Sequence, residues 1–541
     1  MFKKISNFWN SETPGLTAAA FIIGVASLAS RLVGVLRDRA LASTFGAGDA
    51  LDAYYAAFRV PDILYNLLIL GALSAGFIPI FTEYLEHQDK SEAWRLAENI
   101  LSVVGSVLVF ACLVIALFAP IIVPLTVPGF SSPKLELTVH LARIMSLSPL
   151  LLGLSAVMGG ILQATRRLIA FAFAPVLYNL GIIFGTSVLA PHWGVEGVAW
   201  GVVLGAGLHL FVQALAAMRL GVKRLAWPSL RHKGVRRIIK LMLPRAAGLA
   251  VSQFNLVILL VLASSLSVGS VAVFNLANNL QAFPVGIIGV SFALAAFPIL
   301  SKAAARQDRV TFAASFESAA RKITFFMLPA MALFFLSRAQ IVRLALGSGA
   351  FDWHDTIRTA TVLGIFLISL LGQAMVPLLA RGFYAWQNTL TPLWIGAVAE
   401  SVNLLLAFVL RRTYGIVGLA IAFSVTAYVN GLLLFWFLRR QHGPISTGGY
   451  LSSALKTVCA STAILALGYP VRQLVGTIFP LRTVWQVALQ AGAASLCGLA
   501  GFIFVAWSLR SPELHELRVA ISRKFFRQVS SVAGVEEAQG V

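Results

Sequence analysis

Apolar runs of about 20 residues recur along this chain from Leu16 to Leu509, and a helix of that length crosses the ~30 Å hydrocarbon core of a bilayer. Hydrophobic residues make up 58% of the 541 residues, whereas soluble domains contain roughly 45–50%. The sequence therefore predicts an all-α polytopic membrane protein.

The apolar runs predict about fourteen transmembrane helices. Several runs are longer than a bilayer requires, so we expect tilted or bent helices, with bends at Pro61, Pro79, Pro244, Pro284 and Pro298. The predicted spans are 15–44, 49–84, 95–122, 137–164, 168–190, 195–219, 235–264, 269–300, 312–343, 356–382, 389–410, 415–438, 450–470 and 484–509.

The net charge of +21 comes largely from short loops between the apolar runs. In a soluble protein such a charge would suggest nucleic-acid binding. In a membrane protein, loops on the cytoplasmic side carry an excess of Lys and Arg, and this excess explains the positive net charge. We therefore expect no nucleic-acid partner. The loops at Lys90–Arg95, Arg219–Lys240 and Lys302–Lys322 are basic, as are both ends of the chain. Both termini are therefore predicted to be cytoplasmic.

An internal repeat indicates a duplicated architecture. Trp193–Ala199 resembles Tyr414–Ala420 at an offset of 221 residues, and other short matches follow at nearly the same offset. The offset covers six predicted helices, an even number, so both copies point the same way. We predict two pseudo-symmetric six-helix lobes around a central cavity. The predicted domains are residues 1–219, 220–440, 441–510 (helices 13 and 14) and 511–541 (a cytoplasmic amphipathic tail).

The tail segment Ser511–Ser530 has the pattern of a basic amphipathic helix. Such a helix is expected to lie on the cytoplasmic leaflet, and a solvated helix is the alternative. The apolar positions are Leu514, Leu517, Ile521 and Phe525, and the basic ones are Arg518, Arg523, Lys524 and Arg527.

Charged residues inside the first apolar run point to a substrate site. Arg31, Arg37, Asp38 and Arg39 fall within or at the end of this run, and Asp52 follows in the next. A charge at the bilayer centre costs roughly 2.5–3.5 kcal/mol, so such residues face a cavity or a partner. Guanidinium groups suit phosphate, and the two aspartates would orient them. We predict a phosphate-bearing anionic substrate. For Arg39, and also for the deeper Arg31 and Arg37, a side chain that extends to the membrane interface is the alternative.

Arg59, which precedes Pro61, is a further candidate for the cavity. The alternative is an ion pair between Arg59 and either Asp62 or Asp52. Asp52 itself has an alternative role as a carboxylate at the start of a helix.

Amides in the second half of the chain form a second candidate group. A polar cluster in the 269–300 span either joins helices or lines a pore; it consists of Asn275, Asn278, Asn279 and Gln281. Asn255, Glu400 and Asn403 provide oxygen ligands that suit a cation. The alternative for Glu400 is a neutral side chain that hydrogen-bonds between helices.

The sequence contains no Walker A pattern, metal-ligand spacing or nucleophile elbow. The three cysteines, Cys112, Cys459 and Cys497, lie in apolar runs and are expected to be small buried side chains. We therefore expect a transporter and not an enzyme, with no cofactor or metal. A monovalent cation or the membrane potential is the expected energy source.

The segment from Ala26 to Thr82 resembles the MurJ/MviN family. The resemblance extends over the first twelve helices and is carried by Arg37-Asp38, Phe45-Gly-Ala-Gly48, Asp52-Ala53 and Phe77-Ile-Pro79-Ile, with further matches at Phe283-Pro284, Pro298-Ile-Leu-Ser301 and Gly382-Phe-Tyr384. These proteins are lipid II flippases of the multidrug/oligosaccharidyl-lipid/polysaccharide exporter superfamily.

The resemblance implies a function in peptidoglycan synthesis and cell shape. The family moves an undecaprenyl-pyrophosphate-linked precursor from the inner to the outer leaflet of the bacterial cytoplasmic membrane, by alternating access, and cavity arginines bind the pyrophosphate. It implies cavity roles for Arg31, Arg37, Asp38 and Asp52. Membrane lipids and other cell-wall synthesis proteins are the implied partners.

The chain departs from the family pattern at several charged positions. The family usually has arginine at Tyr65, Asp-Arg at Asn278-Asn279 and glutamate at Leu70. Two alternatives to a lipid II flippase therefore remain. One is an exporter of another polyprenyl-pyrophosphate-linked glycan, and the other is a non-transporting membrane scaffold descended from a flippase.

Overall fold

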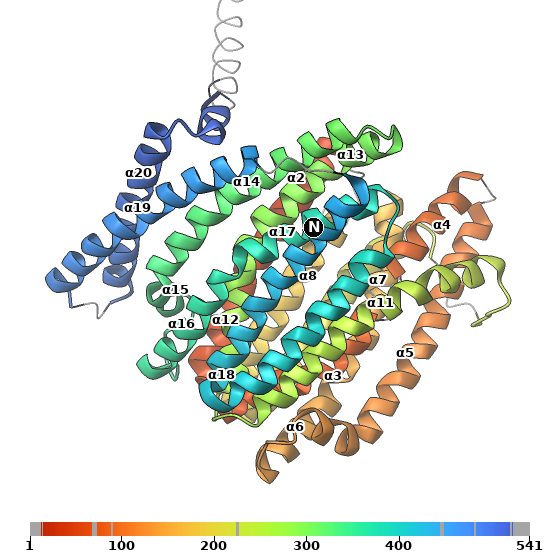
Figure 1. Ribbon diagram of the computed structural model, residues 1–541. Coiled ribbons are helices and arrows are strands. Elements are labelled where there is room, and N and C mark those ends of the chain that lie inside the picture. Colours follow the sequence, from red (N-terminus) through yellow and green to blue (C-terminus); the bar gives the residue numbers. More distant parts are fainter. Residues whose placement is uncertain are drawn as a thin grey trace, which may run out of the picture. The chain divides into compact units, whose positions relative to one another are not determined.

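The computed structural model describes residues 12, 15–67, 73–87, 90–222, 227–443, 448–480, 483–519 and 522. Within these ranges every regular element is a helix and there is no strand (Figure 1). The predicted all-α class is confirmed.

The first half of the chain forms ten α-helices and one π-helical turn. These are α2 (Gly15–Phe45), α3 (Asp49–Tyr65), α4 (Leu73–His87), α5 (Lys90–Thr126), α6 (Ser132–Met145), α7 (Leu147–Ala164), α8 (Leu168–Phe184), the turn at Gly185–Leu189, α9 (Ala190–Trp193), α10 (Val195–Met218) and α11 (Lys233–Ser264).

The second half continues with further helices and one π-helical turn. These are α12 (Ser270–Pro284), the turn at Val285–Val290, α13 (Ser291–Ala305), α14 (Arg309–Leu336), α15 (Arg338–Ala345), α16 (Trp353–Ile368), α17 (Leu370–Ala385), α18 (Leu390–His442), α19 (Gly448–Ile478) and α20 (Val484–Ser508).

Nine helical segments of the described chain are long and apolar enough to cross a membrane. The number becomes ten if α16 and α17, bent by 44° at their junction, form one span. Helix α5 shows the outward apolar surface that lipid contact requires, because Phe110, Leu117 and Leu125 are 70%, 70% and 72% exposed. Every predicted span overlaps a helix, and the count of fourteen stays a prediction.

Helix α18 contains the boundary that was predicted between the spans 389–410 and 415–438. Gly415 has φ 55° and ψ −132°, a non-helical conformation within the 53-residue segment. Such a positive φ is readily available only to glycine, so this residue permits the kink. Of the predicted proline bends, Pro284 directly precedes the π-helical turn at Val285–Val290.

The chain divides into two compact units. Unit 1 contains Met1–Leu276, Ala345–Thr359 and Leu404–Leu419, and unit 2 contains Ala277–Leu344, Ala360–Asn403 and Ala420–Val541. The lobes predicted from the repeat, residues 1–219 and 220–440, stay a prediction.

Each unit has its own aromatic core. In unit 1, the rings of Phe77 and Phe81 stack at 5.2 Å, and Trp94 meets Phe81 edge-on at 5.7 Å. In unit 2, Phe325 of α14 packs against Phe502 of α20 at 5.6 Å. Helices α19 and α20, drawn in blue, lie side by side (Figure 1).

Helices α8 and α10 approach each other through glycines, and this contact supports a prediction. A Cβ on Gly201 of α10 would lie 2.9 Å from the carbonyl oxygen of Gly181 in α8 and 2.6 Å from the Cα of Gly185, the first residue of the π-helical turn that follows α8. A Cβ on Gly207 of α10 would meet nothing within 4 Å. We expect Gly201→Leu to lower the free energy of unfolding by about 1–3 kcal/mol or more, because the helices must separate. Thermal unfolding in detergent, with Gly207→Leu as the unaffected control, measures this difference.

Candidate functional site

Arg37 of α2 is fixed by partners on two helices of unit 1. Its Nε and Nη2 donate to Oδ1 of Asp38 at 3.0 and 2.7 Å, and its Nη1 donates to Oδ1 of Asn179 in α8 at 2.9 Å. The Asp38 side chain is only 8% exposed and that of Arg37 24%. Since a guanidinium has five N–H donors and three are used here, two remain for an anionic ligand.

Three tyrosines interact electrostatically with this guanidinium. Tyr54 and Tyr55 of α3 and Tyr178 of α8 lie within electrostatic range of Arg37. The hydroxyls of Tyr55 and Tyr178 are buried and form no hydrogen bond with any residue that the structure describes. Buried hydroxyls normally have partners, so these two are available as donors to a ligand.

Asn179 and the three tyrosines were not among the residues predicted from the sequence. Asn179 is a polar residue in the apolar run of α8, four residues after Pro175, and its Nδ2 donates to the Pro175 carbonyl at 3.0 Å. An amide in an apolar span is the kind of signal that could have identified it.

The other predicted cations of this region lie nearby in the sequence but have different surroundings. Arg31 and Arg39 are half-buried on α2, on either side of Arg37. Arg59 of α3 lies with its Nη1 3.6 Å from Oδ2 of Asp62, which is one of the two pairings considered for it. The Nε of Arg59 is buried without a hydrogen bond in the described chain. Arg59 is therefore loosely paired.

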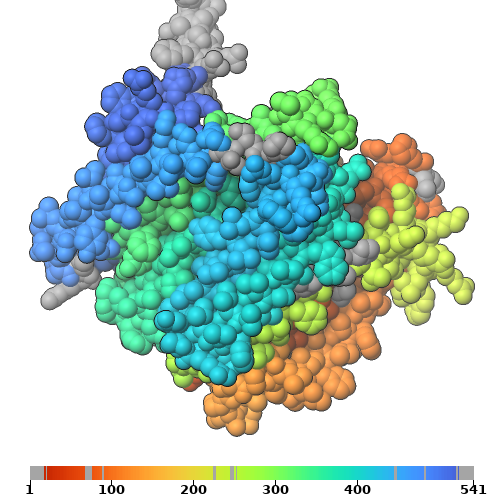
Figure 2. Space-filling view, viewed as in Figure 1, coloured from red at the N-terminus to blue at the C-terminus, as the bar shows by residue number. Residues whose placement is uncertain are grey.

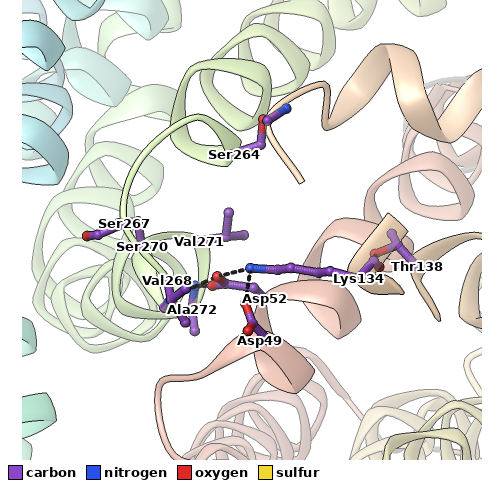
Figure 3. A network of polar contacts seen from close by, with 12 residues as sticks. Asp49, Asp52, Lys134, Thr138, Ser264, Ser267, Val268, Ser270, Val271 and Ala272 are labelled. Carbon is purple, nitrogen blue, oxygen red and sulfur yellow. Dashed lines mark hydrogen bonds and ion pairs between the residues drawn. The ribbon is translucent and has the colours of Figure 1, made fainter. Parts of the chain in front are cut away.

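Asp52 is buried, and both of its carboxylate oxygens are occupied (Figure 3). Oδ2 accepts from Lys134 Nζ at 2.7 Å and from the backbone N–H of Gly269 at 2.8 Å, and Oδ1 accepts from the backbone N–H of Ala272 at 2.8 Å. Lys134 also reaches Oδ1 of Asp49 at 2.7 Å. Asp52 therefore caps the start of α12 and connects α3, α6 and α12.

The loop between α11 and α12 is held by two arginines as well. Arg358 donates from Nη1 to the Val268 carbonyl at 3.0 Å and from Nη2 to Oγ of Ser267 at 3.2 Å. Arg411 donates from Nη1 to Oγ of Ser265 at 2.8 Å. Together with Asp52, these contacts fix the loop in one position. We call the contacts of Asp52, Lys134, Gly269 and Ala272 the Asp52 clamp.

One described group of side chains has the spacing to ligate a metal. Ligand atoms of Asp352, His354 and Asp355 lie within 4.8 Å of one another at the start of α16. Two of the carboxylate oxygens already have partners, because Asp352 accepts from the Asp355 amide at 2.8 Å and Asp355 accepts from the Ala47 amide at 2.9 Å. These aspartates therefore serve as caps for backbone amides.

In unit 2, the amides of α12 form a chain to α17. Gln281 is 1% exposed; its Nε2 donates to Asn278 at 3.0 Å, and its Oε1 accepts from Gln373 at 2.7 Å. Gln373 also donates to Ser369 at 2.7 Å. Gln281 therefore joins helices, which is one of the two roles considered for the cluster, whereas Asn279 is exposed.

The predicted cation ligands fall in both units. Glu400 and Asn403 of unit 2 contact each other, with Asn403 Nδ2 3.5 Å from Glu400 Oε2. Asn403 is 1% exposed, and its Oδ1 has no hydrogen-bond partner within the described ranges. Asn255 is buried in α11 of unit 1. The structure thus brings together two of the three predicted ligands.

The positions at which the sequence departs from the MurJ/MviN pattern are placed as follows. Tyr65 is the last residue of α3 and is half-buried. Asn278 and Asn279 lie on α12. Leu70 lies outside the described residues.

A family model described as lipid II flippase MurJ matches residues 41–487 of the chain. The chain belongs to the MurJ family. MurJ proteins are transporters and not enzymes, so the expectation of a transporter is confirmed.

Individual MurJ relatives match over most of their length. The lipid II flippase MurJ of Burkholderia cenocepacia is 31% identical, over 82% of this chain and 87% of the relative. The probable lipid II flippase MurJ of Rhizobium meliloti is 30% identical, over 95% and 97%. The chain thus covers most of the length of both relatives.

Solved structures show the same fold. A lipid II flippase MurJ in an inward closed conformation matches with a TM-score of 0.75 and 23% identity, over 90% of this chain and 99% of that one. An inward-facing multidrug resistance MATE family transporter of the MOP superfamily matches with a TM-score of 0.63 and 17% identity, over 81% of this chain and 98% of that one. The fold is that of MurJ, and the chain is a multi-pass membrane protein.

Proposed function

We propose that this chain is a flippase that moves lipid II from the inner to the outer leaflet of the bacterial cytoplasmic membrane by alternating access. The observation that carries the proposal is the half-buried Arg37, which has two free N–H donors, together with the hydroxyls of Tyr55 and Tyr178, which form no hydrogen bond in the described chain. The names of its relatives support the same substrate.

The proposed substrate contact is made by the pyrophosphate. The free N–H groups of Arg37 and the hydroxyls of Tyr55 and Tyr178 are donors that suit phosphate oxygens. Asp38 and Asn179 hold the guanidinium so that it cannot turn away from the ligand. Arg31 and Arg59 add positive charge, and the exposed Asn279 is proposed to contact the headgroup.

Alternating access follows from the proposed lobes, residues 1–219 and 220–440, with residues 441–510 and 511–541 appended. Asp52 and Lys134 belong to the first lobe, whereas Gly269 and Ala272 belong to the second. The Asp52 clamp would therefore join the lobes at one end. With both termini in the cytoplasm, that end is the outer one, and the clamp must open before the substrate is released.

We propose that the energy comes from a monovalent cation or from the membrane potential, without a cofactor. Glu400 Oε2 accepts from Asn403 Nδ2 at 3.5 Å, and the Asn403 Oδ1 has no hydrogen-bond partner in the described chain. Asn255 is proposed as a third ligand.

A second candidate is export of another polyprenyl-pyrophosphate-linked glycan. Tyr65 and Asn279 favour it, because they offer no positive charge at two positions where the family usually has arginine. Contacts with other cell-wall synthesis proteins are also part of the proposal, and they would remain if the chain were a scaffold.

Complementation tests the proposed substrate. We expect the chain to restore growth of a bacterium depleted of its own lipid II flippase. If the chain reaches the membrane in normal amounts and growth is not restored, lipid II is not its substrate. The related glycan exporter then becomes the better account.

A further inference from the structure

The end of α20 and the segment after it enclose a cleft of about 840 Å³. Helix α20 ends at Ser508, and a short helix follows at 512–519. This segment, in dark blue, lies at the surface of the molecule (Figure 2). We call this space the tail cleft; its walls include Ile503, Trp507, Arg510, His515, Leu517 and Arg518.

The short helix is anchored through its acidic residues. Glu513 is 5% exposed; Ser453 donates to its Oε1 at 2.7 Å and Ser511 to its Oε2 at 2.9 Å. Arg321 lies 3.5 Å from Glu513, and a second pair joins Lys322 to Glu516 at 3.2 Å. The helix is therefore docked on α14 and α19, and its negative charges are neutralised there.

The basic residues of the same segment remain uncompensated. Arg510, His515 and Arg518 line the tail cleft and form no ion pair within the described part of the chain. Arg510 has φ 51°, a conformation that residues with a Cβ rarely adopt. The turn imposes it, since the Arg510 amide donates to Trp507 and the Ser511 amide to Ala506. The backbone that carries the Arg510 side chain is thus fixed beside the cleft.

The other walls of the cleft are apolar. Ile503 and Trp507 of α20 are 48% and 64% exposed, and Val484–Ser508 is one of the candidate membrane spans. The apolar walls therefore belong to the last turns of a span, and the cations come directly after it. An anionic phospholipid has the same order of groups, with acyl chains in the hydrocarbon and a phosphate at its edge.

We propose that the tail cleft binds an anionic membrane phospholipid. Arg510 and Arg518 contact the phosphate, and the acyl chains lie against Ile503 and Trp507. The site is distinct from the proposed lipid II site, and its occupancy does not depend on which substrate is transported.

Lipid retention by the full chain tests this site. We would purify the protein in detergent, add dioleoyl phosphatidylglycerol or dioleoyl phosphatidylcholine, and measure bound lipid by native mass spectrometry. We expect Arg510→Gln with Arg518→Gln to weaken phosphatidylglycerol binding roughly thirtyfold, since each basic residue at an anionic surface contributes about fivefold. Phosphatidylcholine should bind weakly to every variant.

Two further variants separate a built site from general charge attraction. Arg439→Gln with Arg440→Gln removes the same charge from an exposed helix end and should leave binding unchanged. Glu513→Ala makes the chain more positive but removes the anchor of the short helix, so we expect weaker binding. Thermal unfolding without lipid checks that each variant is folded.

Several outcomes would overturn the proposal. These are equal binding of the two lipids, equal losses in the two arginine pairs, or stronger binding by Glu513→Ala. Displacement of the lipid by millimolar inorganic phosphate would indicate a free-anion site instead. A full chain that binds no phosphatidylglycerol would show that something else, such as its own residues after 522, occupies the cleft.

Discussion

We expect Arg37→Ala to abolish the proposed transport of lipid II, so that growth of the flippase-depleted bacterium is not restored. The change removes both N–H donors that are free for the pyrophosphate. A hydrogen bond to a charged group contributes about 1.5–3 kcal/mol, so losing two weakens substrate binding roughly a hundredfold or more. Flipping rates in liposomes, measured against substrate concentration, would show this loss.

Control variants separate recognition from folding. Arg37→Ala also removes the ion pair of the buried Asp38, which is destabilising in itself. Arg37→Ala combined with Asp38→Asn removes that charge and should fold better, yet remain inactive. Arg37→Lys keeps the charge but loses the planar fork, so we expect a partial loss. Near-normal transport by Arg37→Ala would remove Arg37 from the proposed site.

Asp52→Asn lowers the free energy of unfolding by about 3 kcal/mol and opens the clamped end of the protein. Asparagine has the shape of aspartate, but one of its two terminal groups is an NH₂ that cannot accept a hydrogen bond. In one orientation this group would face the donors of Lys134 and Gly269, and in the other the donor of Ala272. Lys134, itself buried, would also lose a charge partner. Thermal unfolding, together with alkylation of a cysteine introduced beside the clamp, would measure both effects.

Asp49→Asn is the matched control for this variant. Asp49 contacts the same lysine, but its side chain is 59% exposed, whereas that of Asp52 is 2% exposed. An exposed ion pair contributes about 0–1 kcal/mol, so we expect little change in stability or accessibility. Equal effects of the two variants would show that burial of the Asp52 clamp does not matter.

The positions of the membrane helices could be predicted from the sequence, because the length of an apolar run is visible in the run itself and does not depend on the rest of the fold. Arg37 and Asp38 could also be identified, since a charged side chain in an apolar run has a high free energy in the membrane unless it has a partner or faces a cavity. The partner Asn179 is 142 residues from Arg37, and no local pattern connects the two. Local signals show which residues need partners, but the fold determines which partners they receive.

Asp52 is a second residue whose partners could not be predicted from the sequence. Its charge and position led us to predict a role in orienting the cavity guanidiniums, with a helix-start carboxylate as the alternative. In the structure it contacts Lys134 and two backbone amides at the start of a distant helix. Backbone amides carry no sequence signal, so this clamp could not have been found before the fold was known.

The C-terminal segment was predicted to lie on the membrane as an amphipathic helix. The structure describes a helix at 512–519, anchored by Glu513, while Arg523, Lys524, Phe525 and Arg527 lie outside the described residues. A buried glutamate in a basic segment is easily taken for a solvated residue, because its partners come from α14 and α19.

The most direct test of the proposed function is transport by the purified protein. The chain would be reconstituted into liposomes that carry fluorescent lipid II in one leaflet, and the labelled headgroup would be quenched from outside. The account predicts that the wild-type chain moves lipid II across the bilayer and that Arg37→Ala does not. Lipid II that stays in its leaflet, although the protein is folded and inserted, would contradict the account.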